Sequence, residues 1–406
     1  MFQKSTDREL CLLSLSELER LAETYGLKTV EKIPCQVRRM VAATILAEGK
    51  LEEIGSLASS EEIDLLIFDD EISPHQQRNL EKLWKKAVID RTELILEVFA
   101  QRAQTREARL QIELAKVKYQ MPRLKRLWTH LSRQVAGGGG YLKGEGEKQI
   151  ELDRRLLRER INRLQKEIQE VHAHRMQQRS ARLKREIPTF AIVGYTNVGK
   201  STLLRALTEA DVLVEDQLFA TLDTTTRRYT LPNKQTILLI DTVGFIRKIP
   251  HTLVAAFKST LEEAVHTDIL LHIIDASHPE AILQAETATT VLKELGATHQ
   301  RVIHVLNKVD LCQDRLMLSR LRIEYSNTVA ISAKDGSGFK ELLELMMKEI
   351  ASLRKTVSLR IPQSHYALVS ELMRQAKVLA LEYEENDILM QVEIPLSLES
   401  KVAQFL

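Results

Sequence analysis

The octapeptide at positions 194–201, Gly-Tyr-Thr-Asn-Val-Gly-Lys-Ser, constrains the fold more than any other stretch of this chain. It matches the phosphate-binding pattern G-x-x-x-x-G-K-[ST]. The preceding residues 189–193 have the composition of a buried strand, and residues 202–207 that of the first turns of a helix. A glycine loop between a strand and a helix predicts an α/β domain in which backbone N–H groups and the helix N-terminus hold a phosphate.

Two side chains of this loop have specific expected roles. Lys200 would reach the β- and γ-phosphates of a nucleotide, and the Ser201 hydroxyl would ligate Mg²⁺. The alternative is a glycine-rich turn that occurs here by chance. The order of the motifs farther along the chain therefore decides between the two interpretations.

A second motif indicates guanine as the base. Residues 307–310, Asn-Lys-Val-Asp, follow the apolar run 302–306, as N-K-x-D does at the carboxyl end of a strand, where ligands bind in open α/β sheets. The Asp310 carboxylate can accept hydrogen bonds from the N1–H and the exocyclic amine of guanine, and adenine offers no such pair of donors. With the wrong base, polar groups would stay unpaired. Residues 331–334, Ile-Ser-Ala-Lys, fit a third loop that contacts the base.

Two segments between these motifs are expected to form the switches. Residues 238–244 predict a strand that ends in D-x-x-G, with Asp241 in the outer shell of the Mg²⁺ and the Gly244 N–H at the γ-phosphate. Residues 218–223, the first switch, should supply a threonine hydroxyl that completes the Mg²⁺ shell when the γ-phosphate is present. By chemistry alone the candidates for that hydroxyl are Thr221, Thr224, Thr225 and Thr226.

The residue after this glycine is Phe245, where many GTPases have a glutamine that orients the attacking water. A phenylalanine side chain cannot orient water. We therefore predict slow intrinsic hydrolysis that a partner or another residue accelerates. Alternatively, Phe245 only packs beneath the second switch, which we define as residues 241–248.

Residues 190–280 resemble the G domain of the HflX family of translational GTPases. The family's switch threonine lies in its F-A-T-L-D segment, so the resemblance assigns that role to Thr221, and the family also has phenylalanine after D-T-V-G. The segments that match are 194–228 and 241–263, with weaker similarity through 128–134 and 151–155.

The motifs and the resemblance together predict the site residues. Lys200, Thr221 and Gly244 are the expected catalytic residues, and Ser201 and Thr221 the expected Mg²⁺ ligands. The residues expected to contact the nucleotide are Gly194, Tyr195, Thr196, Asn197, Val198, Gly199, Lys200, Ser201, Phe219, Ala220, Thr221, Leu222, Asp223, Asp241, Thr242, Val243, Gly244, Asn307, Lys308, Val309, Asp310, Ser332, Ala333 and Lys334.

A basic segment precedes the nucleotide motifs. Residues 91–187 contain 23 Lys and Arg against 12 Asp and Glu, whereas the whole chain has a formal net charge of +2. Apolar residues at helical spacing over 91–128 and 148–185, joined by the glycine-rich residues 137–146, predict an antiparallel helical hairpin. Such a basic surface is typical of a protein that binds a polyanion, although solvated helices are often basic as well.

The glycine-rich tip of the hairpin, residues 137–146, is either a plain connection or a probe whose bare backbone approaches RNA. In HflX relatives the resemblance implies that this loop reaches the catalytic centre of the large ribosomal subunit. The usual family stretch resembles G-T-R-G-P-G-E, whereas this chain has Lys143 in place of the arginine and no proline. Because lysine and arginine are not interchangeable at a stacked or bidentate contact, the detailed contacts are expected to differ.

Other features indicate a cytoplasmic location. The chain has no apolar run of the ~20 residues that span a membrane, and its first residues lack a signal-peptide pattern. Cys11, Cys35 and Cys312 lie far apart, as expected of small core residues in a reducing compartment. Peripheral membrane association is left open, and the polar hairpin favours a monomer. His75 lies near Asp69 and Asp70 in the sequence, but a single histidine beside carboxylates is interpreted as a surface group without a catalytic role.

We expect a multidomain α/β protein with four units. These are an N-terminal α/β domain with strands near 27–33 and 64–69 (1–90), the hairpin (91–187), a GTPase domain built on a mixed sheet with helices on both faces (188–353), and a small C-terminal α/β domain (354–406).

The expected function is hydrolysis of GTP to GDP and phosphate with Mg²⁺. The resemblance further implies binding to the 50S subunit and its rRNA, and a role in ribosome splitting, rescue or assembly. One alternative is a GTPase switch that binds a non-ribosomal protein through the hairpin. Its partner binding would be insensitive to salt, because counterion release makes RNA binding strongly salt-dependent. A general P-loop ATPase would require four ordered motifs to coincide by chance.

Overall fold

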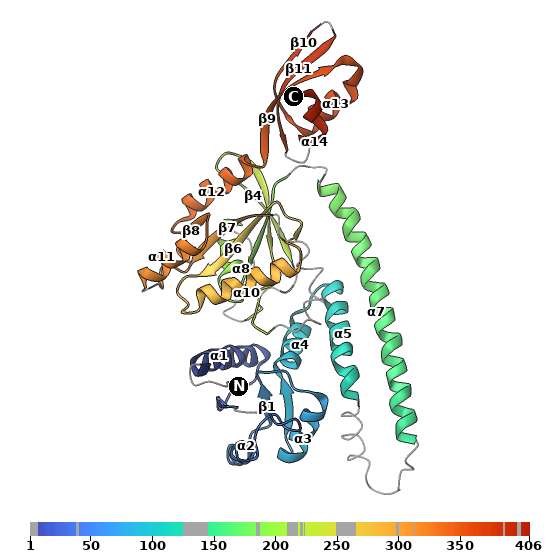
Figure 1. The fold of residues 1–406 in the computed structure, drawn as a ribbon, viewed down its shortest axis with the longest axis vertical. Helices are drawn as coiled ribbons and strands as arrows, with labels where there is room; N and C mark the ends of the chain where they lie inside the picture. Colours follow the sequence, from blue (N-terminus) through green and yellow to red (C-terminus); the bar gives the residue numbers. More distant parts are fainter. Residues whose placement is uncertain are drawn as a thin grey trace.

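The computed structural model describes residues 7–37, 40–124, 145–183, 187–208, 218–219, 222, 224–248, 265–297, 300–312, 314–384, 386–395 and 399–406. An N-terminal unit, a central α/β unit and a C-terminal unit follow one another along the long axis of the molecule (Figure 1). One long helix runs beside the first two units. We propose unit boundaries at residues 90, 187 and 353, as expected from the sequence. The helix that follows the first boundary, α4 (Arg91–Arg102), packs on α1 (Arg8–Tyr25) and is described with the N-terminal unit.

The central unit is built on a six-stranded sheet in the order β4-β5-β3-β6-β7-β8. β4 and β5 are antiparallel, and the other neighbouring strands are parallel, so the expected mixed sheet is confirmed. The strands are β3 (Thr189–Gly194), β4 (Thr225–Thr230), β5 (Thr236–Asp241), β6 (Ile269–Asp275), β7 (Arg301–Asn307) and β8 (Thr328–Ala330). Every residue of β6 is buried, because helices cover both faces of a parallel sheet. The helices are α8 (Lys200–Thr208), α10 (Ala281–Glu294), α11 (Arg315–Glu324) and α12 (Phe339–Ala351).

The N-terminal unit has a parallel two-stranded sheet, β1 (Leu65–Phe68) and β2 (Ala87–Asp90). Its helices are α1 (Arg8–Tyr25), α2 (Glu48–Ser60), α3 (Pro74–Trp84) and α4 (Arg91–Arg102). The strand expected near 27–33 is wrong. After α1 ends at Gly26, with φ at 95°, these residues join neither strand of this sheet and no other described strand.

The hairpin consists of α5 (Arg106–Gln120) and the 39-residue helix α7 (Glu145–Leu183). The single arm expected over 91–128 is broken after α4, because the Thr105 hydroxyl accepts a hydrogen bond from the Ala108 N–H at 3.2 Å and starts a new helix. The apolar residues on which the two hairpin helices pack are Leu110, Leu114, Val117, Leu157, Ile161, Leu164, Ile168 and Val171. The glycine-rich tip lies outside the described residues up to position 144.

The C-terminal unit is a three-stranded antiparallel sheet in the order β10-β11-β9, packed against α13. Its elements are β9 (Arg354–Pro362), α13 (Tyr366–Gln375), β10 (Lys377–Tyr383), β11 (Asp387–Pro395) and α14 (Glu399–Val402). The unit is therefore α/β, as expected.

The largest apolar cluster joins the N-terminal and central units. It includes Leu21 and Ala22 of α1, Phe99 of α4, and Phe190 and Ile192 of β3. Because α1 and α4 bury one face against the central unit, the N-terminal unit is positioned directly against the segments that carry the nucleotide motifs.

Candidate functional site

The phosphate loop connects β3 to α8, as the sequence predicts. Gly199 has φ at 95°, and a Cβ there would collide with the side-chain amide of Asn307, so only glycine fits this turn. Asn307 in turn donates from Nδ2 to the Val198 carbonyl at 2.7 Å and accepts from the Ala333 N–H at 2.9 Å. One side chain therefore holds the phosphate loop and both base-contacting loops together.

The neighbouring Lys308 has a similar bracing role. Its ammonium donates to the Asn197 carbonyl at 2.8 Å and pairs with Asp275 at 2.7 Å. Asp310, by contrast, is exposed at the end of β7, where a base can reach its carboxylate. The geometry thus divides the N-K-x-D motif into two residues that brace loops and one that is open to a ligand.

Lys200 lies buried at the start of α8. Its Nζ donates to the carbonyl of Tyr195 at 2.7 Å and to that of Gly194 at 3.3 Å. Burial, partly offset by the carboxylate of Asp241, lowers the pKa of the Lys200 ammonium to about 8. Phosphate oxygens beside this ammonium would stabilise its charged form and raise the pKa again.

The expected Mg²⁺ ligand Ser201 lies beside Asp241, with 2.9 Å between its Oγ and Oδ2 of the carboxylate. Among the described residues, no group of three or more His, Cys, Asp or Glu side chains gathers around a possible metal position. A hydroxyl with a carboxylate behind it is a hard oxygen donor set, which suits Mg²⁺ when nucleotide phosphates and water supply the remaining ligands.

The second switch packs directly on the phosphate loop. The Thr196 N–H donates to the Phe245 carbonyl at 2.7 Å, and the Phe245 N–H donates to the Gly194 carbonyl at 3.0 Å. A Cβ at Gly244 would lie 2.8 Å from Lys200 Nζ and 2.9 Å from Thr196 Cα, so this glycine is in close contact with the loop. The D-x-x-G glycine is therefore required for packing as well as for its expected N–H contact.

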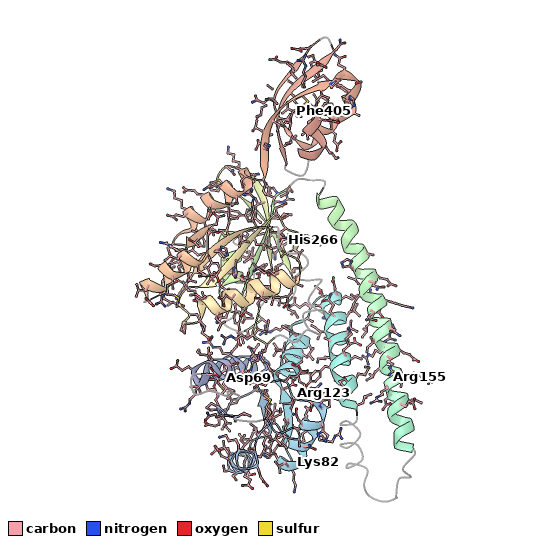
Figure 2. The ribbon with its side chains drawn as sticks, in the orientation of Figure 1. Asp69, Lys82, Arg123, Arg155, His266 and Phe405 are labelled. Carbon is pink, nitrogen blue, oxygen red and sulfur yellow. The ribbon has the colours of Figure 1, made fainter. Side chains whose placement is uncertain are left out.

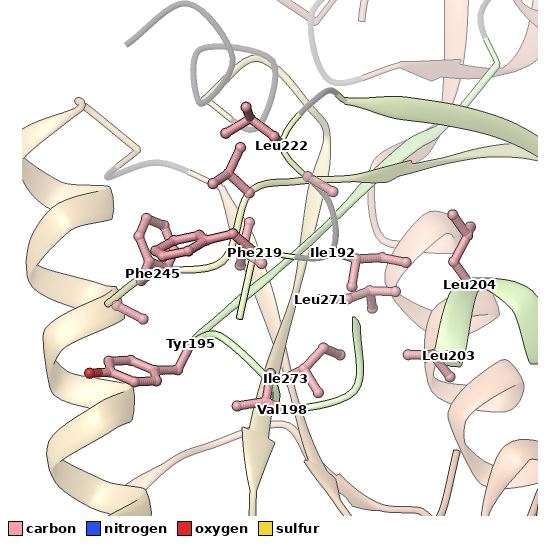
Figure 3. Close-up of a cluster of buried hydrophobic side chains, with 14 of the residues drawn as sticks. Ile192, Tyr195, Val198, Leu203, Leu204, Phe219, Leu222, Phe245, Leu271 and Ile273 are labelled. Atoms are coloured by element: carbon pink, nitrogen blue, oxygen red, sulfur yellow. The ribbon is translucent and has the colours of Figure 1, made fainter. Parts of the chain in front are cut away.

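Phe245 is buried, with 1% of its surface exposed. It lies in an apolar cluster with Phe219 and Leu222 of the first switch segment (Figure 3). The Phe219 ring also packs edge-on against Phe99 of α4, with 4.4 Å between ring centroids. A second link from the first switch to the N-terminal unit runs from the Leu218 N–H to the Thr24 hydroxyl of α1, at 3.3 Å.

Sequence comparison assigns the family. Residues 13–100 match the family model described as GTP-binding GTPase N-terminal, residues 102–182 the GTP-binding GTPase middle region, and residues 189–308 the 50S ribosome-binding GTPase. A GTPase HflX from Chlamydia pneumoniae is 48% identical, with 100% of this chain and 86% of that protein covered.

The chain belongs to the HflX family of GTPases.

The chain is also similar to other known proteins. The GTPase HflX of Escherichia coli K12 is 40% identical over 94% of this chain and 90% of that protein. Among solved structures, a GTP-binding protein from the archaeon Sulfolobus solfataricus in complex with GDP is 28% identical, with a TM-score of 0.45, 87% of this chain covered and 98% of that chain covered. As an HflX-family protein, this chain binds GTP and hydrolyses it.

Most of the expected site residues of this HflX-family protein lie together at the carboxyl ends of β3, β5 and β7. The Thr242 hydroxyl donates to the Ile192 carbonyl at 2.8 Å, and this bond fixes the start of the second switch on β3. Ser332 and Ala333 are buried, and Lys334 is exposed. Ala220, Thr221 and Asp223 lie outside the described residues, so the role of Thr221 remains a prediction.

The sequence gave no signal for the residues of the N-terminal unit that meet this site. Glu17 of α1 bonds to the Tyr195 hydroxyl and to Arg91, and Asp69 bonds to Arg91 at 2.7 Å and to Lys248 at 2.5 Å. The sequence predicts only that Asp69 ends a buried strand, and the structure shows that Ser14, Arg91 and Lys248 enclose its carboxylate. His75 is exposed, as expected.

No helix in the described parts of the chain is both long enough and apolar enough to cross a bilayer.

Proposed function

We propose that this GTPase binds the large ribosomal subunit in its GTP form through the α5–α7 hairpin, and acts in ribosome splitting, rescue or assembly. The supporting observation is the outer surface of α7, where Arg154, Arg155, Arg158 and Lys166 are exposed (Figure 2 labels Arg155). A helix with an apolar seam on one side and basic groups on the other can lie along a polyanion.

Two further observations agree with this proposal. The family model that matches residues 189–308 describes 50S ribosome-binding GTPases. The hairpin is also braced, because Arg160 of α7 pairs with Glu113 of α5 at 2.5 Å. A braced hairpin presents its charges in a fixed row, so less conformational entropy is lost when RNA binds.

The nucleotide roles follow from the site. Lys200 would contact the β- and γ-phosphates, and Asp310 would select guanine. Ser201, together with Thr221, would hold Mg²⁺, which neutralises charge on the phosphates when bound. Because Phe245 is buried and apolar, we expect slow intrinsic hydrolysis that the ribosomal particle accelerates.

Co-sedimentation with purified 30S, 50S and 70S particles tests the proposal, with GDP or a non-hydrolysable GTP analogue, across a salt series. We expect binding to 50S in the GTP form, weakened steeply by salt, with GTP turnover raised by the particle. The charge-reversed variant R154E/R158E should lose this binding. R320E/R322E on α11 is the matched control, because it removes two exposed arginines that lie away from the hairpin.

Other outcomes are equally informative. If both variants bind the 50S subunit as strongly as the unmodified protein does, the contact belongs to a surface other than α7. An absence of binding in every nucleotide state at low salt would overturn the ribosomal proposal and leave the GTPase assignment intact. A salt-insensitive protein partner would then favour the alternative switch function.

A further inference from the structure

Tyr195, in the second position of the phosphate loop, connects the nucleotide site to the N-terminal unit. Its hydroxyl donates a hydrogen bond to the Glu17 carboxylate of α1 and accepts one from the Arg247 N–H at 2.8 Å. Tyr195 is 4% exposed, and its hydroxyl points away from the apolar cluster (Figure 3). Both hydrogen-bonding functions of the hydroxyl are therefore used, one by each unit.

The Glu17 carboxylate is fixed from its other side. The Arg91 guanidinium, 2% exposed in its side chain, donates one Nη to Glu17 at 2.5 Å and the other to Asp69 at 2.7 Å. Buried charges that lose a partner are strongly unfavourable, so each of these groups keeps the next in place. Burial and then the charge of Glu17 raise the pKa of the Tyr195 hydroxyl well above its ordinary value, so it remains a donor.

The same group of charged residues also contacts the second switch at Lys248, the residue after Arg247. Asp69 accepts hydrogen bonds from Lys248 Nζ at 2.5 Å and from the Ser14 hydroxyl at 2.7 Å, and Lys248 also pairs with Asp70 at 2.6 Å. Asp69 lies on the side of the N-terminal unit that faces the central unit (Figure 2). Lys248 of the second switch is thus held directly by the N-terminal unit, and Arg247 is held indirectly, through the Tyr195 hydroxyl that bonds to Glu17.

The position in which the switch is held affects nucleotide binding. Phe245 is bonded to both Gly194 and Thr196 of the phosphate loop, and even one added carbon at Gly244 would lie 2.8 Å from Lys200 Nζ. The same built position lies 2.9 Å from Thr196 Cα, so the Gly244 backbone lies against both the Lys200 ammonium and the phosphate loop. A γ-phosphate that contacts both this ammonium and the Gly244 N–H has to lie between them, and it therefore requires the second switch to move away from the phosphate loop.

We propose that Glu17 is a positioning residue for the GTPase reaction: through the Tyr195 hydroxyl it holds the second switch on the phosphate loop, so that the N-terminal unit opposes binding of the γ-phosphate. The nucleotide preference of the enzyme then depends on contacts more than 170 positions away in sequence, since Glu17 and Tyr195 are 178 residues apart. This inference requires GTP binding and is independent of any ribosomal partner.

The test uses equilibrium titration of the full-length protein with mant-GDP and mant-GMPPNP. Glu17→Gln and Tyr195→Phe keep the side-chain shapes and remove the charge or the hydroxyl. Because a hydrogen bond to a charged group is stronger than one between neutral groups, we expect the affinity for mant-GMPPNP relative to mant-GDP to rise roughly tenfold in each variant. In Glu17→Gln the KM for GTP should fall accordingly, with little change in kcat.

Lys248→Gln removes the ion pairs of the second switch with Asp69 and Asp70, and it should also raise the affinity for mant-GMPPNP relative to mant-GDP. Lys248 is partly exposed, so this variant remains informative if the buried substitutions prevent folding. Glu23→Gln is the matched control, because Glu23 is exposed on the same helix α1 and should leave the ratio unchanged. Hydrogen exchange of residues 241–248 should be faster in the three variants than in this control.

Two results would overturn the inference. One is an affinity ratio of mant-GMPPNP to mant-GDP that is unchanged or lowered in folded Glu17→Gln and Lys248→Gln proteins. If only their unfolding temperature falls, the contacts stabilise the fold and do not affect nucleotide preference. The other is an equal rise in Glu23→Gln, which would indicate general loosening of α1 and no specific role for Glu17.

Discussion

The lowered pKa of Lys200 predicts that nucleotide binding takes up a proton. Burial lowers the pKa of the ammonium in the folded protein to about 8, from an ordinary value of 10.5. Phosphate oxygens beside Nζ favour the charged form, so the pKa rises when a nucleotide binds. The complex therefore holds more protons than the free protein at pH values above about 7, and affinity falls as the pH rises through 8.

The size of the effect follows from this pKa. The neutral fraction of Lys200 grows from roughly one tenth at pH 7 to about one half at pH 8, so binding at pH 8 should take up about half a proton. Between pH 7 and about pH 8.5 the affinity for GDP should fall roughly fourfold. Isothermal titration calorimetry in buffers of different ionisation enthalpy measures the uptake directly.

A variant isolates the contribution of the lysine. Lys200→Met, titrated at higher nucleotide concentration, should lose the proton uptake on binding at pH 8. Any proton uptake by the nucleotide phosphates themselves should persist in this variant. If the unmodified protein takes up no proton at pH 8, or if Lys200→Met takes up the same amount, the explanation from a buried ammonium is wrong.

Three further predictions concern other parts of the chain. Asp310→Asn should move base preference from guanine to xanthine nucleotides in a competition assay, because an amide can donate to the xanthine 2-oxo group; an unchanged preference would contradict the role of Asp310. Thr105→Ala should lower the free energy of unfolding by about 1 kcal/mol in urea titrations, through loss of the α5 cap. Burial alone would raise the pKa of the Asp69 carboxyl, but the charges of Arg91 and Lys248 lower it to about 2, from an ordinary value of 3.8. The net shift contributes about 2 kcal/mol of stability that is present above pH 4 and lost as the pH falls through 2. Unfolding measured from pH 6 to pH 2 should accordingly show a smaller acid dependence in Asp69→Asn than in the unmodified protein.

The nucleotide site could be predicted because its chemistry is local in sequence. A phosphate loop needs its glycines, its lysine and its serine within eight positions, and the strand before and the helix after them are equally local. The N-K-x-D motif is four consecutive residues, so Asn307 and Asp310 could be found, although the bracing role of Asn307 was not apparent from the motif.

What the sequence could not predict depends on pairing over long distances. Glu17, Asp69 and Arg91 are ordinary charged residues in sequence, and only the packing of α1 and α4 on the central unit brings them to Tyr195 and Lys248. The break at Thr105 was missed because a threonine within a helical pattern is recognised as a cap only when the backbone before it leaves the helix.

The length of α7 has a mechanical consequence. At 1.5 Å per residue, its 39 residues form a rod about 58 Å long. The rod ends at Leu183, six positions before the first residue of β3, the strand that leads into the phosphate loop. A tilt of only about 10° at that end would carry the opposite end through about 10 Å, given this rise per residue. Movements of an ångström or two beside the nucleotide can therefore become displacements at the hairpin tip as large as the diameter of a helix.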